Sequence, residues 1–213
     1  MIELYTAPTP NGRKASIMLE EIGLPYLAHR VDLGAGDQHQ ADFLKLNLNS
    51  KIPVIHDPDT GVTLAESGAI LSYLAEKTGK FQPKDLKTRY ETLQWLMFQM
   101  ASVGPMLGQL GHFRHAAEPV PAALRRYEKE AKRILAVLDR RLADRGFLVG
   151  DYGIADIATW PWINAAAALD LTLSDYPHLR RWHGAIKTRP AVKRGMAVPS
   201  ADAARPFALP AAA

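Results

Sequence analysis

The sequence predicts two domains, a mixed α/β domain at the N-terminus and an all-helical domain after it. Two observations support this division. Short strand-like runs alternate with helical patterns up to about residue 80, and from Leu86 onward only long helical periodicities remain. The chain has 213 residues, 47% of them hydrophobic, which is enough for two buried cores. We expect domains at residues 1–80 and 86–196, and a flexible tail at 197–213 that is rich in Ala and Pro.

The first domain begins with a predicted strand–helix–strand unit. Residues 2–5 form a short strand pattern, and the loop Pro8–Gly12 leads into a helix. Apolar residues recur at helical spacing from Ala15 to Ile22, and Gly23 ends the run. A second strand follows at Tyr26–Val31, so the unit has about 30 residues, the size expected for βαβ.

The rest of this domain predicts a short helix, a hairpin and a longer helix. The short helix lies at residues 41–46, and two strands, Ile52–His56 and Val62–Ala65, flank a turn at Asp57–Gly61. A helix opens at Glu66–Gly68 and stops at Gly79. This order describes a four-stranded mixed sheet with helices packed on it, which is the thioredoxin-like arrangement.

The second domain is predicted to consist of amphipathic helices. One apolar stripe runs from Tyr90 through Met97 to Met100, and another runs from Leu124 to Leu142. Further helices are expected at residues 154–169 and 176–188. The apolar segment 154–173 contains acidic residues and Pro161, so it predicts a buried core helix and no membrane span.

Composition excludes several classes of function. The chain has no cysteine, so it has no disulfide, no thiolate metal site and no catalytic protein thiol. His112 and His115 lack acidic partners at metal-ligand spacing, and we expect no metal site. The net charge of +4 comes with acidic and basic residues interspersed, as at 125–130, which argues against nucleic-acid binding. The N-terminus has no signal-peptide pattern, which predicts a cytoplasmic protein.

Three short motifs in the first domain have the chemistry of a ligand site. Ile52-Pro53 leads a strand, where a cis bond would expose the Ile52 backbone to an extended peptide. Glu66-Ser67 stands where a strand gives way to a helix, so Ser67 is either a simple cap or part of an anion site. Thr9 and Asn11 precede the first helix, as a turn and cap or as donors to a thiolate.

Six motifs in chain order carry a resemblance to a known family. They are Thr9-Pro10-Asn11-Gly12, Asn49-Ser50-Lys51-Ile52-Pro53, Glu66-Ser67-Gly68-Ala69-Ile70, Leu93-Gln94-Trp95-Leu96, Gly104-Pro105-Met106-Leu107-Gly108-Gln109, and Ile154-Ala155-Asp156 before Trp160-Pro161-Trp162. Over nearly the full chain this pattern resembles the glutathione transferase superfamily. Its details look most like the bacterial nu-class members, which reduce disulfides with glutathione.

The resemblance implies a role for each candidate site residue. Thr9 and Asn11 would hold the glutathione thiolate, while Tyr5, the residue type that several other classes use, stays open as an alternative. The other implied glutathione contacts are the backbone at Ile52 and Pro53, Glu66 and Ser67 at the γ-glutamyl head group, Gln38 and Lys51 near the glycyl end, and Arg126 at a second glutathione.

The implied function is that of a homodimeric glutathione-dependent disulfide-bond reductase. Because the chain has no thiol, glutathione would be both the attacking and the resolving thiol. Reduction of organic hydroperoxides and weak conjugation are implied as side activities, and small disulfides or hydroperoxides as substrates. Two alternatives stay open: a detoxifying transferase that acts on electrophiles, and a non-catalytic docking module on the same fold.

One position departs from the family pattern. Most members have Ser or Thr three residues before the aspartate at 156, where this chain has Gly153. Glycine is an acceptable N-cap that costs about a few tenths of a kcal/mol. From the sequence we therefore expect Gly153→Ser to raise the melting temperature.

Overall fold

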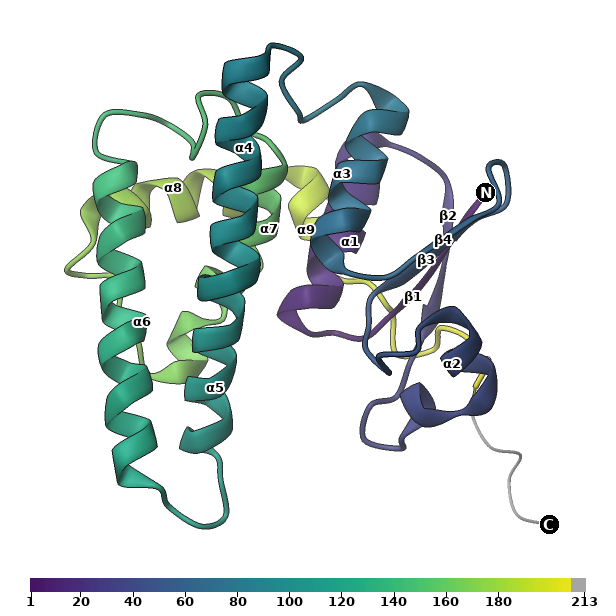
Figure 1. The fold of residues 1–213 in the computed structure, drawn as a ribbon, viewed down its shortest axis with the longest axis horizontal. Helices are drawn as coiled ribbons and strands as arrows, with labels where there is room; N and C mark the ends of the chain where they lie inside the picture. Colours follow the sequence, from purple (N-terminus) through teal and green to yellow (C-terminus); the bar gives the residue numbers. More distant parts are fainter. Residues whose placement is uncertain (208–213) are drawn as a thin grey trace. The chain divides into compact units, whose positions relative to one another are not determined.

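The structure, a computed structural model, describes residues 1–207 and divides into two compact units (Figure 1). Among residues 1–207, the first unit is Met1–Thr78 together with residues 190–207, and the second is Gly79–Arg189. The first has a four-stranded sheet with helices and the second is helical, which confirms the predicted fold class. The boundaries differ from the predicted ones mainly at the C-terminal end, where the chain returns to the first unit.

The sheet of the first unit has the strand order β2-β1-β3-β4. Its strands are β1 (Ile2–Thr6), β2 (Tyr26–Arg30), β3 (Val54–Asp57) and β4 (Val62–Leu64). β1 pairs parallel with β2, antiparallel pairing joins β1 to β3, and the hairpin joins β3 to β4. The parallel pair β1–β2 is joined by a helical crossover, and the antiparallel hairpin β3–β4 needs only a tight turn.

Three helices of the first unit form where the sequence predicts them. They are α1 (Pro10–Ile22), the short α2 (Ala41–Leu46), which follows a 3₁₀ turn at Asp37–His39, and α3 (Ser67–Thr78). α1 ends at Gly23, whose φ of 74° lies in the left-handed region that glycine adopts at little cost. The buried face of α1 includes Ile17, Met18 and Leu19.

The C-terminal segment of the described chain lies against the first unit. A further helix, α9 (Pro190–Met196), packs against α1 so closely that a Cβ on Gly195 would lie 2.6 Å from the Ile17 Cα. Beyond it, Arg205 contacts the buried Asp37 at 3.0 Å and Phe207 packs on Phe43. Residues 197–207 thus differ from the flexible tail that the sequence predicts, and residues 208–213 lie outside the described part.

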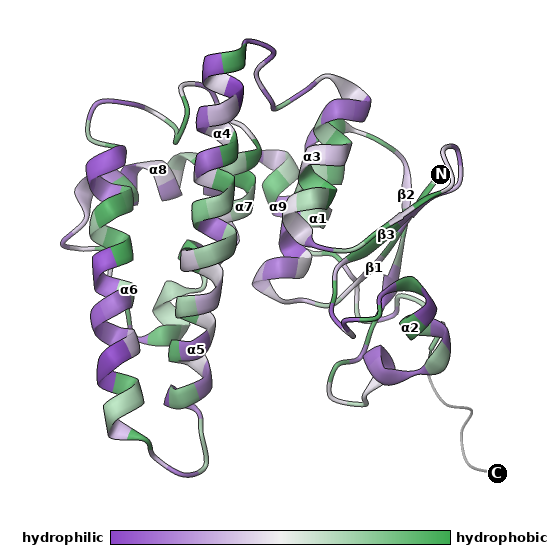
Figure 2. Ribbon diagram, viewed as in Figure 1, coloured by the Kyte–Doolittle hydropathy of each residue, from purple (hydrophilic) through white to green (hydrophobic). Residues whose placement is uncertain are grey.

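Five longer helices build the second unit. They are α4 (Leu86–Phe98), α5 (Gly104–Arg114), α6 (Pro121–Arg141), α7 (Ile154–Asn164) and α8 (Pro177–Lys187). A π-helical turn at Gln99–Val103 joins α4 to α5, and a 3₁₀ turn at Ala166–Leu169 ends the segment predicted as one helix. Figure 2 shows α6 alternating between hydrophilic and hydrophobic bands, whereas α7 is mostly hydrophobic, in agreement with its burial. No helix in residues 1–207 combines the length and apolar character that a bilayer span requires.

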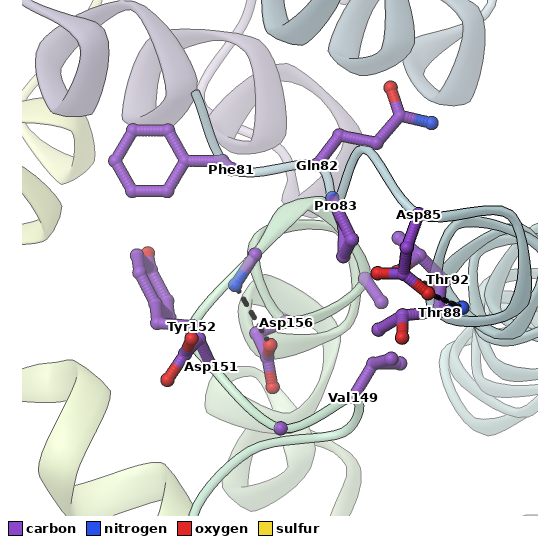
Figure 3. Close-up of a pocket in the computed structure, with 13 residues that line it drawn as sticks. Phe81, Gln82, Pro83, Asp85, Thr88, Thr92, Val149, Asp151, Tyr152 and Asp156 are labelled. Carbon is purple, nitrogen blue, oxygen red and sulfur yellow. Dashed lines mark hydrogen bonds between the residues drawn. The ribbon is translucent and has the colours of Figure 1, made fainter. Parts of the chain in front are cut away.

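Buried Asp156 organises the start of α7 (Figure 3). Its carboxylate accepts hydrogen bonds from the Leu148 N–H at 2.9 Å, the Gly153 N–H at 3.1 Å and the Trp182 indole N–H at 2.7 Å. Burial raises the pKa of Asp156 to about 6, and the three donors act against that rise. The carboxylate therefore ties the loop before α7 to α8. Asp156 and Gly153 line a cavity of about 360 Å³ between α4 and this loop.

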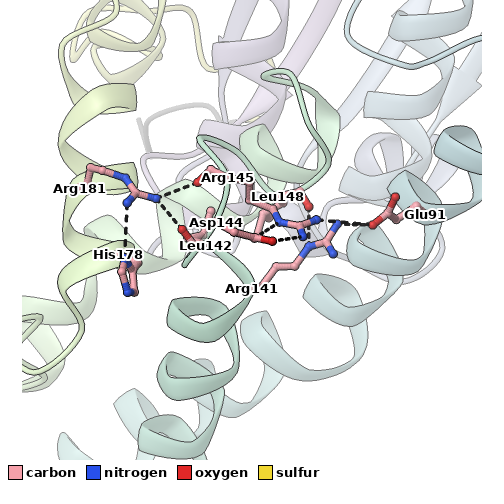
Figure 4. Close-up of polar contacts among 8 residues, drawn as sticks. All are labelled: Glu91, Arg141, Leu142, Asp144, Arg145, Leu148, His178 and Arg181. Carbon is pink, nitrogen blue, oxygen red and sulfur yellow. Dashed lines mark hydrogen bonds and ion pairs between the residues drawn. The ribbon is translucent and has the colours of Figure 1, made fainter.

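Arginines join α6 to its neighbours (Figure 4). Arg141 pairs with Glu91 of α4 and donates through Nε to the Leu148 carbonyl at 2.7 Å. Arg181 of α8 donates to the Arg145 carbonyl at 2.7 Å, and to the Leu142 carbonyl as well. Because backbone carbonyls outside helices and strands have no regular hydrogen-bond partners, these guanidinium groups satisfy acceptors in the segment that follows α6.

Gly153 has a different role from the one that the sequence suggests. The Phe81 carbonyl accepts the Ile154 N–H at 3.0 Å, and a Cβ on Gly153 would lie 2.8 Å from that same oxygen. The space that a capping Ser side chain would need is therefore taken by backbone. The expected effect of Gly153→Ser is reversed.

We predict that Gly153→Ser lowers the free energy of unfolding by about 1–3 kcal/mol, the usual cost of overpacking. Gly153→Ala is the matched control, because it adds the same Cβ without a capping hydroxyl. Urea denaturation of the three proteins checks this, and a Ser variant that is more stable than the wild type would contradict it.

Candidate functional site

The sheet register brings three loops to one edge of the first unit. Tyr5, near the end of β1, pairs with Val54 at the start of β3. Ile55 in turn pairs with Leu64 at the end of β4. The segment after β1, the segment before β3 and the segment after β4 therefore lie together. These are the segments that carry the three sequence motifs.

A cavity of about 270 Å³ lies among these segments. It is lined by Asn11, Asn47, Lys51, Ile52, Pro53, Glu66 and Ser67. All but Asn47 are residues that the sequence singles out. Both amides and both charged side chains are hydrogen-bonding groups, so the cavity suits a polar, extended ligand with more than one charged end.

The turn that begins α1 holds Thr9 and Asn11. Thr9 is the N-cap, and its Oγ1 accepts the Gly12 N–H at 3.2 Å. An accepting hydroxyl still carries a hydrogen to donate. The turn folds back tightly, since a Cβ on Gly12 would lie 2.2 Å from the Ala7 carbonyl oxygen. Thr9 does not line the cavity, although Asn11, two residues on, does.

The loop before β3 presents backbone groups. The Ile52–Pro53 peptide bond is cis, as the sequence predicts. Among residues 1–207, the N–H and C=O of Ile52 make no backbone hydrogen bond. The Asn47 side chain donates to the Lys51 carbonyl at 2.7 Å, which fixes the loop and explains why Asn47 lines the cavity. The Lys51 side chain is exposed.

The transition from β4 to α3 places Glu66 and Ser67. Glu66 has a φ of 64°, a left-handed conformation that costs a non-glycine residue about 1–3 kcal/mol. Ser67 is the first residue of α3 and is buried, while Glu66 is exposed. The free N–H groups and the positive end of a helix favour an anion at such a start.

Behind Ser67 lies a buried lysine that sequence reasoning missed. Lys14 of α1 is 1% exposed, and its Nζ donates to the Ser67 Oγ at 3.2 Å. Burial lowers the pKa of Lys14 to about 7, and the negative charge of Glu66 acts against that shift. A signal was available, because Lys14 stands four residues before Met18, in the apolar stripe of the helix.

Tyr5 is the alternative candidate for thiol activation. Its hydroxyl donates to the Glu3 carboxylate at 2.5 Å, and its ring stacks on His29 with centroids 4.7 Å apart. Burial, and next the hydrogen bond and charge of Glu3, raise the pKa of Tyr5 well above its usual value. A phenol held in this way is a poor stabiliser of a neighbouring thiolate, which favours Thr9 and Asn11.

Besides Thr9, two predicted residues lie outside the cavity lining. Gln38 is in the 3₁₀ turn after β2, where its Nε2 donates to the Leu33 carbonyl at 3.4 Å. Among the described residues its buried Oε1 has no hydrogen-bond partner. Arg126 is exposed on α6 of the second unit and borders a separate cavity of about 410 Å³ with Tyr127, Lys129 and Arg133. Roles for both stay predictions.

No group of three or more metal-ligating side chains gathers anywhere in residues 1–207. The cavity residues supply amides, a hydroxyl, one carboxylate and one ammonium. This donor set suits charged organic groups. The fold and this site together define a thioredoxin-like ligand-binding unit joined to a helical unit.

The chain belongs to the glutathione S-transferase family. The family model of its N-terminal domain matches residues 9–77, and that of its C-terminal domain matches residues 121–185. A curated relative, the disulfide-bond oxidoreductase YfcG of Escherichia coli strain K12, is 48% identical over 203 residues, covering 92% of this chain and 94% of YfcG.

Two solved structures extend the comparison. A glutathione transferase from Burkholderia graminis, with two glutathione molecules bound per subunit, is 47% identical, with a TM-score of 0.90, and covers 94% of this chain and 89% of its own. A glutathione transferase from Pseudomonas putida, with one glutathione disulfide bound per subunit, is 44% identical, with a TM-score of 0.86. The match covers 93% of this chain and 91% of the Pseudomonas chain.

The tight turn at Gly12 gives a prediction about stability. We expect Gly12→Ala to lower the free energy of unfolding by about 1–3 kcal/mol or more, because its Cβ would overlap the Ala7 carbonyl. Gly184→Ala is the control, since that helical position has open space and gains up to about 1 kcal/mol in helix propensity. Equal stability of the two variants in urea denaturation would contradict the assignment.

Proposed function

We propose that this protein is a glutathione-dependent disulfide-bond reductase. The observation that carries the proposal is the cavity in which Asn11, the cis Ile52–Pro53 loop and Glu66–Ser67 meet, in a chain that has no thiol of its own. The identity to YfcG, named a disulfide-bond oxidoreductase, supports it. So do the glutathione and glutathione disulfide in the two related structures. A cytoplasmic location fits, because cytosolic thiols are kept reduced.

Glutathione is an extended peptide with a charged group at each end, and the cavity offers a partner for each part. Ser67 and the start of α3 suit the γ-glutamyl carboxylate, and the Glu66 carboxylate suits the ammonium beside it. The Ile52 N–H and C=O suit the backbone of the cysteinyl residue, as in β-strand addition. Lys51 and Gln38 suit the glycyl carboxylate.

The sulfur of a ligand bound in this way points toward the turn before α1. There the Thr9 hydroxyl and the Asn11 amide are donors, and the positive end of α1 adds to their effect. Lowering a thiol pKa from about 8.5 to about 6.5 needs roughly 2.7 kcal/mol of preferential thiolate stabilisation. Two hydrogen bonds to a charged acceptor, each worth about 1.5–3 kcal/mol, are sufficient.

Two glutathione molecules balance the reaction. The thiolate attacks one sulfur of the substrate disulfide, forms a mixed disulfide with that half and releases the other half as a thiolate, which takes up a proton. A second glutathione thiolate then attacks the glutathione sulfur of the mixed disulfide. It releases the remaining half as a thiol and leaves glutathione disulfide. The two electrons that reduce the substrate thus come from two thiols of glutathione.

The second glutathione needs its own anchor, and Arg126 stays the predicted one. Its guanidinium is exposed, and a guanidinium binds a carboxylate in a bidentate manner. The neighbouring Glu130 makes its hydrogen bonds with Arg133, at 2.7 and 2.8 Å, and among the described residues no hydrogen bond engages the Arg126 guanidinium. Peroxide reduction and conjugation would use the same thiolate and are side activities in this proposal.

We predict that Asn11→Ala lowers kcat for disulfide reduction by about 10–100-fold, the value of one hydrogen bond to a charged group, with a smaller change in glutathione affinity. Tyr5→Phe is the matched control and should keep kcat close to that of the wild type, because the Tyr5 hydroxyl donates its hydrogen bond to Glu3. The assay follows NADPH consumption with glutathione reductase and hydroxyethyl disulfide.

The alternatives predict different results. A larger loss for Tyr5→Phe than for Asn11→Ala would transfer thiolate stabilisation to Tyr5. Turnover of an aryl halide above that of the disulfide would favour a detoxifying transferase. Glutathione binding without any turnover would favour a docking module.

We also propose that the protein is a homodimer formed through α4. Four large apolar side chains on this helix are exposed, namely Leu86, Tyr90, Leu93 and Met97. Their spacing of four, three and four residues places them on one helix face. An exposed apolar stripe of this kind is rare on a monomer, and a two-fold axis would pair it with its own copy.

Replacement of Tyr90 by Glu is expected to shift the protein from dimer to monomer at micromolar concentration, because it puts a charge in the apolar contact. Ala185→Glu adds the same charge at an exposed position of α8 and should leave the dimer intact. Sedimentation velocity measures both. A wild type that sediments as a monomer would refute the proposal.

A further inference from the structure

Among the described residues of the first unit, Lys14 is the one buried lysine. The proposed chemistry assigns it no role. Lys14 is 1% exposed, whereas Lys51 is exposed and Lys77 pairs with buried Asp57 at 2.6 Å at the other end of α3. Burying an ammonium costs free energy unless its surroundings compensate. An apolar residue at this position of the α1 stripe would avoid that cost. The retained charge therefore points to a role at the site.

One hydrogen bond of Lys14 is with the residue that begins α3. Its Nζ lies 3.2 Å from the Ser67 Oγ, and Ser67 lines the cavity from the other side. An ammonium has three donors and no acceptor, so the hydrogen bond runs from Lys14 to Ser67. As long as Lys14 is charged, the hydroxyl hydrogen of Ser67 cannot point back at it. The charge of Lys14 thus sets the side from which Ser67 can donate.

The charges around Lys14 are few and mostly engaged elsewhere. The elements packed against α1 are β1, α3 and α9. Their charged residues are Glu3 on β1, Glu66 before α3, Glu76 and Lys77 at the end of α3, and Lys193 and Arg194 on α9. Glu3 accepts from Tyr5, and Arg194 pairs with Glu20 at 2.5 Å. Glu66 is the charge that raises the pKa of Lys14 against the effect of burial.

We propose that Lys14 is a positioning residue for the γ-glutamyl carboxylate of glutathione, which it serves by orienting Ser67 and by supplying positive charge beneath it. The inference rests on the proposed function, since that function puts the carboxylate at Ser67. Glu66 stands next to this carboxylate and repels it. The ammonium of Lys14 compensates that repulsion from the protein side.

The proposal implies that the affinity for glutathione decreases as the pH rises. Burial lowers the pKa of Lys14 to about 7 in the free protein. A carboxylate bound at Ser67 favours the charged ammonium and raises that pKa, so binding takes up a proton. Affinity is therefore highest below about pH 7, and it falls as the pH rises from about 7 toward the pKa in the complex.

Calorimetric titration with S-methylglutathione tests the proposal, because this probe keeps both carboxylates and has no thiol to titrate. For the wild type we expect the affinity to fall between pH 6.5 and 8, with proton uptake seen in buffers of different ionisation enthalpy. Lys14→Met should bind about 10–100-fold more weakly at pH 6.5, the value of one hydrogen bond to a charged group, and should lose the pH dependence. Lys193→Met removes the same charge from an exposed site of α9 and should match the wild type.

The outcomes are separable. Wild-type binding with no proton uptake and a flat affinity over this range would overturn the role of Lys14 and leave the proposed function standing. This measurement needs no variant, so it decides even where Lys14→Met does not fold. A folded Lys14→Met protein that binds the probe with the affinity and the pH dependence of the wild type would also overturn the role of Lys14. A wild type that does not bind the probe would overturn the proposed function and the inference together.

Discussion

The candidate site depends on the register of one strand. β1 lies between β2 and β3, and its pairing of Tyr5 with Val54 fixes where β3 begins. The hairpin then fixes where β4 ends. Three loops that are distant in sequence must therefore meet at one sheet edge, whatever their own conformations. A shift of the register by one residue would turn every side chain of β3 to the other face, so burial of the strand holds the site in place.

Within that frame the loops adopt conformations that suit ligand binding more than folding. Glu66 has a positive φ, the Gly12 turn approaches the Ala7 carbonyl too closely for any Cβ, and the N–H and C=O of Ile52 make no backbone hydrogen bond among residues 1–207. Each feature costs stability in the free protein. The packing of α1 and α3 against the sheet compensates these costs, and a bound peptide would satisfy the exposed backbone groups.

In the helical unit, order comes from buried polar groups. Asp156 accepts hydrogen bonds from the loop before α7 and from α8, and the Phe81 carbonyl occupies the space beside Gly153 that a capping side chain would need. Arg141 and Arg181 satisfy carbonyls of the segment that follows α6. These contacts are long-range in sequence. The reason for a glycine at the N-cap position 153 is therefore visible only in the folded chain.

The resemblance of the chain's motifs to the family indicated six of the residues that line the cavity. The sequence by itself determined the fold class and the order of strands and helices in the first unit. It could do so because apolar periodicity, Gly and Pro positions and helix-start residues act locally. Only the tertiary structure decided that Lys14 lies beneath Ser67, that the Tyr5 hydroxyl faces Glu3, and that residues 190–207 pack on the first unit. Each of these depends on which segments meet in space. A single sequence does not encode such contacts in any local pattern, because the partner residues are set by packing of the whole chain.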